Sequence, residues 1–162
     1  MRIGLTRRLM VWCGAASMLL PAVNAVAAQV DMFLTIDGIK GEAAAGAIHV
    51  TSVVHQMDAN SGMSVGKRQH NPITITKEVD SASPSLFKAA TSHQVLKQVA
   101  ITFQGSGAGA GKMAQKIVLT NATIASIKKV GNAEQITLNY ETSEVTWTDG
   151  GKTAMDDWSV PK

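Results

Sequence analysis

The feature that most constrains the fold of this chain is an alternation of apolar and polar residues with a period of two. Such a period places alternate side chains on opposite faces of a β-strand. Three stretches show it, and each is therefore predicted to be a strand with one buried face. The apolar residues that share the buried faces are Ile48, Val50 and Val54, then Ile73, Ile75 and Val79, then Val95, Val99, Ile101 and Phe103.

Two later segments change their buried face partway along. In residues 116–127 the parity changes near Asn121, and in residues 135–147 it changes between Tyr140 and Val145. A strand that switches faces usually contains a bulge or a sharp bend, as at the corners of barrels. The two segments therefore favour a closed or nearly closed sheet. The apolar residues concerned are Ile117, Leu119 and Ile124 in the first segment, and Ile136, Leu138, Tyr140, Val145 and Trp147 in the second.

One short helix is predicted between the strands. Ser83 is the expected N-cap and Pro84 stands at the first helical position, where its fixed φ and missing N–H are tolerated. Apolar and partly apolar residues then follow at helical spacing, namely Leu86, Ala89, Ala90 and His93. By contrast, residues 58–71 are rich in glycine, asparagine and serine and show little alternation. We predict a long loop or protruding hairpin there, and loops of this length are commonly functional.

Residues 1–28 have the order of an export signal. Arg2, Arg7 and Arg8 precede an apolar run from Leu9 to Leu20, and small residues follow. The run is too short to span a bilayer as a helix, so we expect cleavage after Ala27 or Ala28. An uncleaved anchor or a start codon placed too far upstream are the alternatives. The arginine pair is also compatible with the twin-arginine route, and the sequence does not choose between the two routes.

The predicted leader changes the apparent charge of the chain. The full sequence has 15 Lys and Arg against 12 Asp and Glu. Three of the arginines lie in the leader, so residues 29–162 carry 12 residues of each sign. A neutral domain has no general electrostatic footprint for nucleic acid or anionic membranes, and we expect protein partners and no stable membrane insertion of the mature chain. The one cysteine, Cys13, is in the leader, so the mature fold is predicted to have no disulfide.

No catalytic, cofactor or metal motif is found. The stretch GSGAGAGK at residues 105–112 resembles a phosphate-binding loop, but Ser106 replaces the first glycine and Met113 the final Ser or Thr. His49 and His55 are too far apart along a strand to share a metal, and His70 and His93 have no ligand-spaced partner. The spacing G-x-S-x-G occurs once, as GMSVG at residues 62–66, but it lies in the predicted loop and not between a strand and a helix, where a nucleophile of this type stands. We therefore predict a protein without an enzyme site, and a small hydrolase with a site spread across strands is a distant alternative.

One stretch, FLTIDGIKGE at residues 33–42, carries most of a resemblance to a known family. Its matching residues are Phe33, Ile36, Asp37, Gly38, Gly41 and Glu42, followed later by Asp80, Ser83, Pro84 and Leu86, then Leu119, Asn121 and Ile124, then Tyr140, Asp157 and Trp158. This series resembles the haemolysin co-regulated protein (Hcp) family, which forms the inner tube of the type VI secretion machine. The similarity runs through almost all of residues 29–162.

The resemblance implies a fold and a function. The fold is mainly β, a compact two-sheet β-barrel with one short side helix, formed by residues 29–162. The function is non-enzymatic: homohexameric rings stack into the type VI tube and carry effectors, with spike, sheath and effector proteins as further partners. The resemblance places contacts between rings in the long loop, so the candidate ring-stacking residues are Asp58, Asn60, Ser61, Met63, Val65, Lys67 and Arg68.

The leader departs from the family pattern, because tube subunits assemble in the cytoplasm and leave through their own machine. If the leader is cleaved, we expect a periplasmic or secreted protein. If it is not a true leader, we expect a cytoplasmic protein with type VI export. The alternative function is an exported periplasmic or extracellular binding module of the same fold that is not part of a tube.

Overall fold

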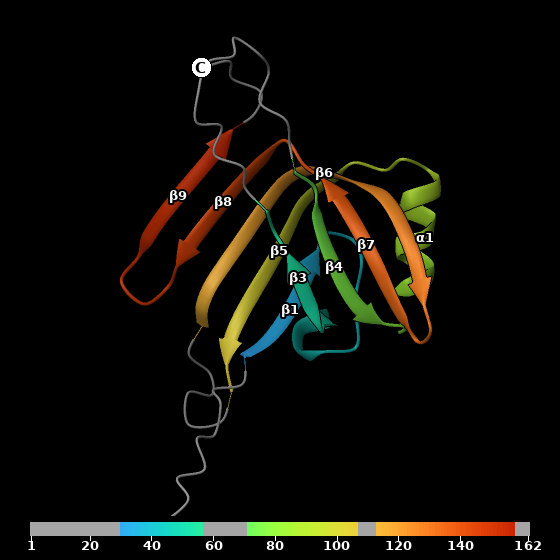
Figure 1. Ribbon diagram of the computed structural model, residues 1–162, viewed down its shortest axis with the longest axis horizontal. Helices are drawn as coiled ribbons and strands as arrows, with labels where there is room; N and C mark the ends of the chain where they lie inside the picture. The colour runs from blue at the N-terminus through green and yellow to red at the C-terminus, as the bar shows by residue number, and fades with distance from the viewer. Residues whose placement is uncertain (1–29, 57–70, 107–112, 158–162) are drawn as a thin grey trace, which may run out of the picture.

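The computed structural model describes residues 30–56, 71–106 and 113–157 (Figure 1). The predicted export signal, all candidate ring-stacking residues between Asp58 and Arg68, and Trp158 lie outside the described residues. The elements, in chain order, are β1 (Val30–Ile36), the 3-10 turn η1 (Ala44–Gly46), β2 (Ile48–Val50), β3 (Ser52–Val54), β4 (Ile73–Glu78), α1 (Ser83–Thr91), β5 (Leu96–Gly105), β6 (Met113–Val130), β7 (Ala133–Asn139), β8 (Thr142–Trp147) and β9 (Lys152–Asp157).

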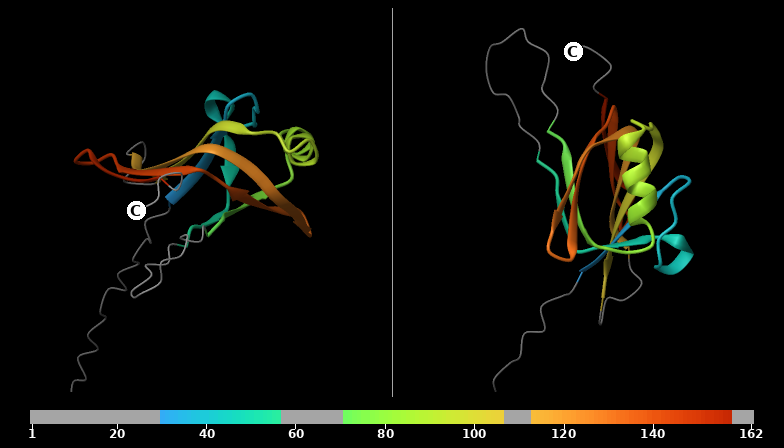
Figure 2. Two further views of the ribbon diagram at one scale, coloured as in Figure 1. Left: turned by 90° about the horizontal axis from the view of Figure 1, so that it is seen from above. Right: turned by 90° about the vertical axis from the view of Figure 1, so that its right-hand side faces the viewer.

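The strands form one nine-stranded antiparallel sheet. Hydrogen-bonded neighbours follow the order β2-β1-β5-β6-β7-β4-β3, and β8 lies between β6 and β9. The long strand β6 belongs to both halves of the sheet, because its first half pairs with β5 and β8 and its second half pairs with β7. Figure 2 shows how β6 changes direction and folds the sheet over the core. The mainly β prediction with one short helix is confirmed.

The predicted barrel of two sheets needs correction in one respect. The sheet is continuous through β6, and the strand path is not closed by hydrogen bonds between its two ends, β2 and β3. These strands follow each other in the chain with only Thr51 between them, so they cannot lie side by side. The backbone N–H and the side-chain hydroxyl of Thr51 both donate to the carbonyl of Thr76 on β4. The fold is thus an open sheet bent round its core.

Both predicted changes of parity are confirmed. Asn121 has a positive φ of 50°, and the register of β6 against β7 shifts between Ile124 and Ser126. Burial passes from Ile117 and Leu119 before the bend to Ala122 and Ile124 after it. The segment that pairs with β6, β7 followed by β8, also changes the parity of its buried face, since Tyr140 and Ser143 are both buried. Residues 113–147 therefore form one long hairpin, β6 against β7 and β8, that is kinked in both of its arms.

Three valines that the alternation assigns to the core are exposed, namely Val54, Val79 and Val95. The break at Thr51 turns the chain, so Val53 packs against the core instead of Val54. Strand β4 ends at Glu78, before Val79, and β5 begins at Leu96, after Val95. Alternation beyond a strand end therefore carries no information about burial.

The helix is found where it is predicted, but Ser83 does not cap it. The N-cap residue is Ala82, no side chain caps the helix, and Pro84 lies in the first turn. Instead, the carboxylate of Asp80 accepts the backbone N–H of Ala82 at 2.9 Å. Leu86 and Ala89 are buried and attach the helix to the core, whereas His93 follows the helix with a positive φ of 49°.

Candidate functional site

The stretch at residues 33–42 is strand β1 and the turn that leaves it. Ile36 and Ile39 form a β-bridge across Asp37 and Gly38, and Gly38 has a φ of 83° that an L-residue rarely adopts. Gly41 is required for another reason. A Cβ at Gly41 would lie 2.4 Å from the carbonyl oxygen of Ala47. The two glycines of this stretch therefore act separately, one through φ and one through close packing.

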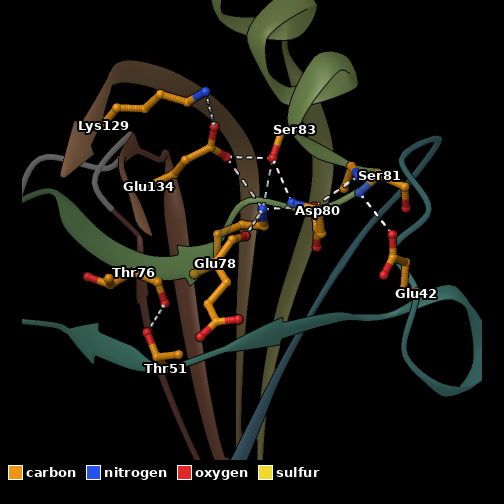
Figure 3. A network of polar contacts seen from close by, with 11 residues as sticks. Glu42, Thr51, Thr76, Glu78, Asp80, Ser81, Ser83, Lys129 and Glu134 are labelled. Atoms are coloured by element: carbon orange, nitrogen blue, oxygen red, sulfur yellow. Dashed lines mark hydrogen bonds and ion pairs between the residues drawn. The ribbon is translucent and has the colours of Figure 1, made fainter. Parts of the chain in front are cut away.

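Glu42 connects this stretch to the beginning of the helix. Its Oε1 accepts the backbone N–H of Ser81 at 3.1 Å (Figure 3). Ser81 lies in the turn that also contains Asp80 and leads into Ser83. The tertiary structure thus places the two resembling segments, which are about 40 residues apart in the sequence, side by side.

A buried lysine organises the polar contacts beside this turn. The side chain of Lys77 is fully buried, and its Nζ lies 2.8 Å from Oδ1 of Asp80 and 3.4 Å from Oε2 of Glu134. It also donates to Ser83 Oγ at 3.1 Å and to the carbonyl of Glu78. Ser83 Oγ in turn donates to Oε2 of Glu134 at 2.7 Å. Figure 3 shows how β4, β7 and the start of α1 converge on this network.

The network favours a structural role over catalysis. A lysine can activate a serine only if its amine has a free lone pair to accept the proton. Lys77 forms ion pairs with two carboxylates, so its ammonium group is already fully used as a donor. Lys77 is not among the residues predicted to form a site, although its parity is a usable signal. It follows Ile73 and Ile75 on the inner face of β4.

A groove lies between α1 and the end of the β6–β7 hairpin. Its volume is about 770 Å³ and it is lined largely by apolar side chains. Phe87 is 64% exposed, and Ile127 is half-buried against the core. Asp80, Ser83 and Glu134 of the buried network form part of its wall. The lining residues are Val79, Asp80, Ser83, Pro84, Phe87, Ala90, Thr91, Ile127, Lys129 and Glu134.

The β8–β9 hairpin forms an arm at the opposite end of the molecule from α1 (Figure 1). Among the described strands, β9 pairs only with β8, so its outer edge is not covered by another described strand. Trp147 and Lys152 are cross-strand partners in the last pair before the turn. Trp147 is 48% exposed and Met155 is 67% exposed. The arm therefore presents both a strand edge and large apolar side chains.

His55 and Tyr140 meet where the chain leaves β3 and enters β4. His55 Nε2 lies 3.2 Å from the Tyr140 hydroxyl, and this hydroxyl lies 3.4 Å from the carbonyl of Asn71, to which it donates. The rings contact edge to face at 6.2 Å between centroids. Burial lowers the pKa of His55. Burial also raises the pKa of Tyr140, where the charge of Asp156 acts in the same direction and the Ser143 hydroxyl opposes it. Tyr140 thus contacts both His55, shortly after β3, and Asn71, shortly before β4.

The described residues contain neither a cluster of metal ligands nor a helix that could cross a membrane. In that part of the chain, no group of three or more His, Cys, Asp or Glu side chains could hold a metal ion. His49, on β2, instead packs edge to face against Phe33 at 5.7 Å between ring centroids. A helix long and apolar enough to cross a membrane is also not found within the described ranges.

Comparison with known proteins places these features in a family context. Residues 33–148 match the family model described as "Type VI secretion system effector, Hcp". The chain is 36% identical over 124 residues to the "Major exported protein" of Pseudomonas aeruginosa, an alignment that covers 67% of this chain and 71% of the relative.

Solved structures agree with the family model. A variant of the Hcp1 protein from E. coli EAEC 042 is 31% identical, with a TM-score of 0.66 over 82% of this chain and 98% of the other. The secreted protein Hcp3 from Pseudomonas aeruginosa is 26% identical, with the same TM-score over 82% and 99%. Hcp1 from Salmonella typhimurium has a TM-score of 0.69 at 23% identity, over 82% and 97%, and supports the fold alone.

Proposed function

Since the chain belongs to the Hcp family of type VI secretion proteins, a family of structural proteins, we propose that it is a non-enzymatic subunit of six-membered rings. In this proposal the rings stack into a tube and carry effector proteins. The observation that carries it is the β8–β9 arm, which holds exposed Trp147 and a strand edge that no other described strand covers. Unpaired strand edges are ready-made surfaces for association with another chain.

Closed rings require heterologous contacts, in which one surface of a subunit meets a different surface of the next. The arm and α1, whose side chains line the groove, lie at opposite ends of the longest axis (Figure 1), which suits such contacts. The spike, sheath and effector proteins of a type VI system are the further partners in this proposal. Residues 58–68, including Asp58 and Arg68, are proposed to contact the neighbouring ring.

The test is the mass of the purified protein by light scattering, combined with electron microscopy. We expect a particle of six chains with a central opening. A strictly monomeric species at high concentration would contradict the ring. A protein that forms the ring but does not bind co-expressed spike and sheath proteins would support ring assembly and contradict a role in the secretion machine.

The second candidate function is an exported binding module of the same fold outside the cytoplasm. The predicted leader at residues 1–28 favours it, and the P. aeruginosa relative named as a major exported protein supports release from the cell by some route. Intact-mass measurement of the native protein distinguishes the cases. A chain that begins near Gln29 indicates cleavage and general export, whereas a retained Met1 indicates cytoplasmic assembly and type VI export.

A further inference from the structure

We propose that the groove beside α1 receives the arm tip of a second copy of this chain, with Trp147 in the groove and Lys152 beside Asp80. The arm tip is defined here as Trp147, Lys152 and the turn between them. This inference rests on the proposed assembly into rings and names the contact that joins neighbouring subunits. The contact is heterologous, because one copy contributes the groove and the other contributes the arm tip.

The groove has the size and lining of a site for a large apolar side chain. Its volume of about 770 Å³ is well within the range of protein pockets that bind ligands. Phe87 and Pro84 stand on its helix side and Ile127 on its strand side. Phe87 is exposed beside the other apolar side chains of the groove, and a contiguous apolar surface of this kind marks a site of association.

The arm tip has matching chemistry. Cross-strand partners in an antiparallel pair lie on the same face, so the Trp147 ring and the Lys152 ammonium project together. Tryptophan is the residue type most enriched at the centres of interfaces, where it fills pockets. A single tip thus presents a large apolar ring with a cation next to it.

The charges of the two surfaces are complementary. The buried network at the groove wall holds two carboxylates, Asp80 and Glu134, against the single cation Lys77. Lys129 also approaches Glu134, but at 3.9 Å and with a 66% exposed side chain, so it is screened by water. Asp80 is the more exposed carboxylate of the pair and is the acceptor that we assign to Lys152.

The position of the two surfaces requires a second copy. The arm tip and α1 lie at opposite ends of the longest axis of the molecule (Figure 1), so the arm of one chain cannot reach its own groove. The same separation lets the contact repeat from copy to copy. With a suitable rotation, such a repeat closes into a ring.

Disulfide trapping tests the contact directly. In the full chain, Cys13→Ser removes the one native cysteine. Adding Pro84→Cys and Lys152→Cys keeps Phe87, Trp147 and Asp80, and oxidation is expected to produce a ladder of covalent multimers on a non-reducing gel. A disulfide spans Cα atoms less than about 7 Å apart, so the pair cannot close within one chain. The matched control is Pro84→Cys with Met155→Cys, since Met155 lies on the opposite face of the arm and is also exposed.

We expect the first pair to cross-link about tenfold faster or more than the control, because bound groups have effective concentrations in the millimolar range. Equal rates would overturn the proposal. A protein that keeps the mass of a ring but forms no ladder would overturn this contact while leaving the proposed function intact. A strictly monomeric protein would overturn both.

Affinity measurements provide a second readout. Trp147→Ala is expected to weaken association about 30-fold, as for a residue at the centre of an interface. Lys152→Glu is expected to weaken it about tenfold, whereas Lys97→Glu, an exposed lysine of β5, should change it less than about threefold. Unchanged circular dichroism and urea midpoints show that each variant is folded. Folded Trp147→Ala protein with unchanged affinity would exclude the groove as the site of the tip.

Discussion

The ammonium group of Lys77 lies 3.4 Å from Oε2 of Glu134, although the two residues are 57 positions apart in the chain. They are direct cross-strand partners of β4 and β7, and both side chains are buried. Because Asp80 and Ser83 share the same cation, the pair also positions the start of α1. The helix side of the groove therefore depends on a charge inside the sheet.

Replacing this lysine tests the network. Lys77→Met is expected to lower the free energy of unfolding by roughly 3–5 kcal/mol, because it leaves the buried Glu134 and the partly buried Asp80 without their cation. Urea unfolding followed by circular dichroism measures the change. The double variant Lys77→Met with Glu134→Gln is expected to be more stable than the sum of the two single changes predicts.

The matched control for Lys77 is Lys129→Met. Lys129 also approaches Glu134, but its side chain is 66% exposed. We expect a change within about 0.5 kcal/mol, as for other surface ion pairs. Similar losses for the two lysines would show that burial does not decide the energetics here.

Gly41 is expected to tolerate no side chain. In Gly41→Ala the new Cβ would lie 2.4 Å from the Ala47 carbonyl oxygen and 2.8 Å from the Cα of Ile48, which are backbone atoms. Relief needs a backbone shift, so we expect a loss of roughly 1–3 kcal/mol in the free energy of unfolding. Gly38→Asn is the contrasting variant, because that position is open and asparagine accepts its positive φ. Thermal unfolding that finds Gly41→Ala as stable as Gly38→Asn would contradict this account.

Asn121 is expected to tolerate glycine but not valine. Its φ of 50° strains an L-residue, most of all a β-branched one, and its Nδ2 donates to Glu141 across the kinked hairpin. We expect Asn121→Val to lose roughly 1–2 kcal/mol or more, from the energy of the left-handed conformation. Asn121→Gly should lose less. Urea midpoints compare the two, and the reverse order would contradict a bend that depends on φ.

The stability of the fold is expected to fall in mild acid through His55. Burial lowers its pKa, so the unfolded chain binds a proton more readily than the folded chain. The stability that neutral His55 contributes is thus present above its ordinary pKa of 6.5 and is lost as pH falls below that value. Free energies of unfolding at several pH values, for wild type and His55→Gln, measure the pH-dependent stability that His55 contributes. Identical pH profiles for the two proteins would exclude His55 as its source.

Deleting residues 60–69 tests the proposed contact between rings. Because Tyr140 joins His55 and Asn71 outside the deletion, we expect the core strands to stay folded in circular dichroism. Rings are expected to form at normal mass, whereas stacks in electron micrographs become shorter. Unfolding of the variant, or stacks of unchanged length, would count against the assignment.

The strands were predictable where one face is buried along the whole strand. Ile73 and Ile75, or Ile117 and Leu119, alternate because the pleat exposes every second side chain. The two kinks were also predictable, since a strand that crosses from one layer to another must change the parity of its buried face. The alternation was wrong at Val54, Val79, Val95 and Trp147, because each lies at a strand end or beyond one.

The candidate sites were less accessible from the sequence. From the sequence, a lysine such as Lys77 is expected at a strand end or on the surface. Its carboxylate partner, Glu134 on β7, is far along the chain. The groove is formed by α1 and a hairpin that starts more than 20 residues later, so no local pattern describes it. The arm was visible only as an alternation continuing to Trp147.

By itself, the sequence determined what local chemistry decides: the strands that bury one face, the helix, the two kinks, and the family motif at residues 33–42. It did so because backbone period, proline and glycine act over a few residues. Only the tertiary structure decided that the sheet stays open between β2 and β3, that Lys77 is buried among carboxylates, and that the arm and the groove lie at opposite ends. These depend on contacts between residues far apart in the chain, which no local pattern encodes.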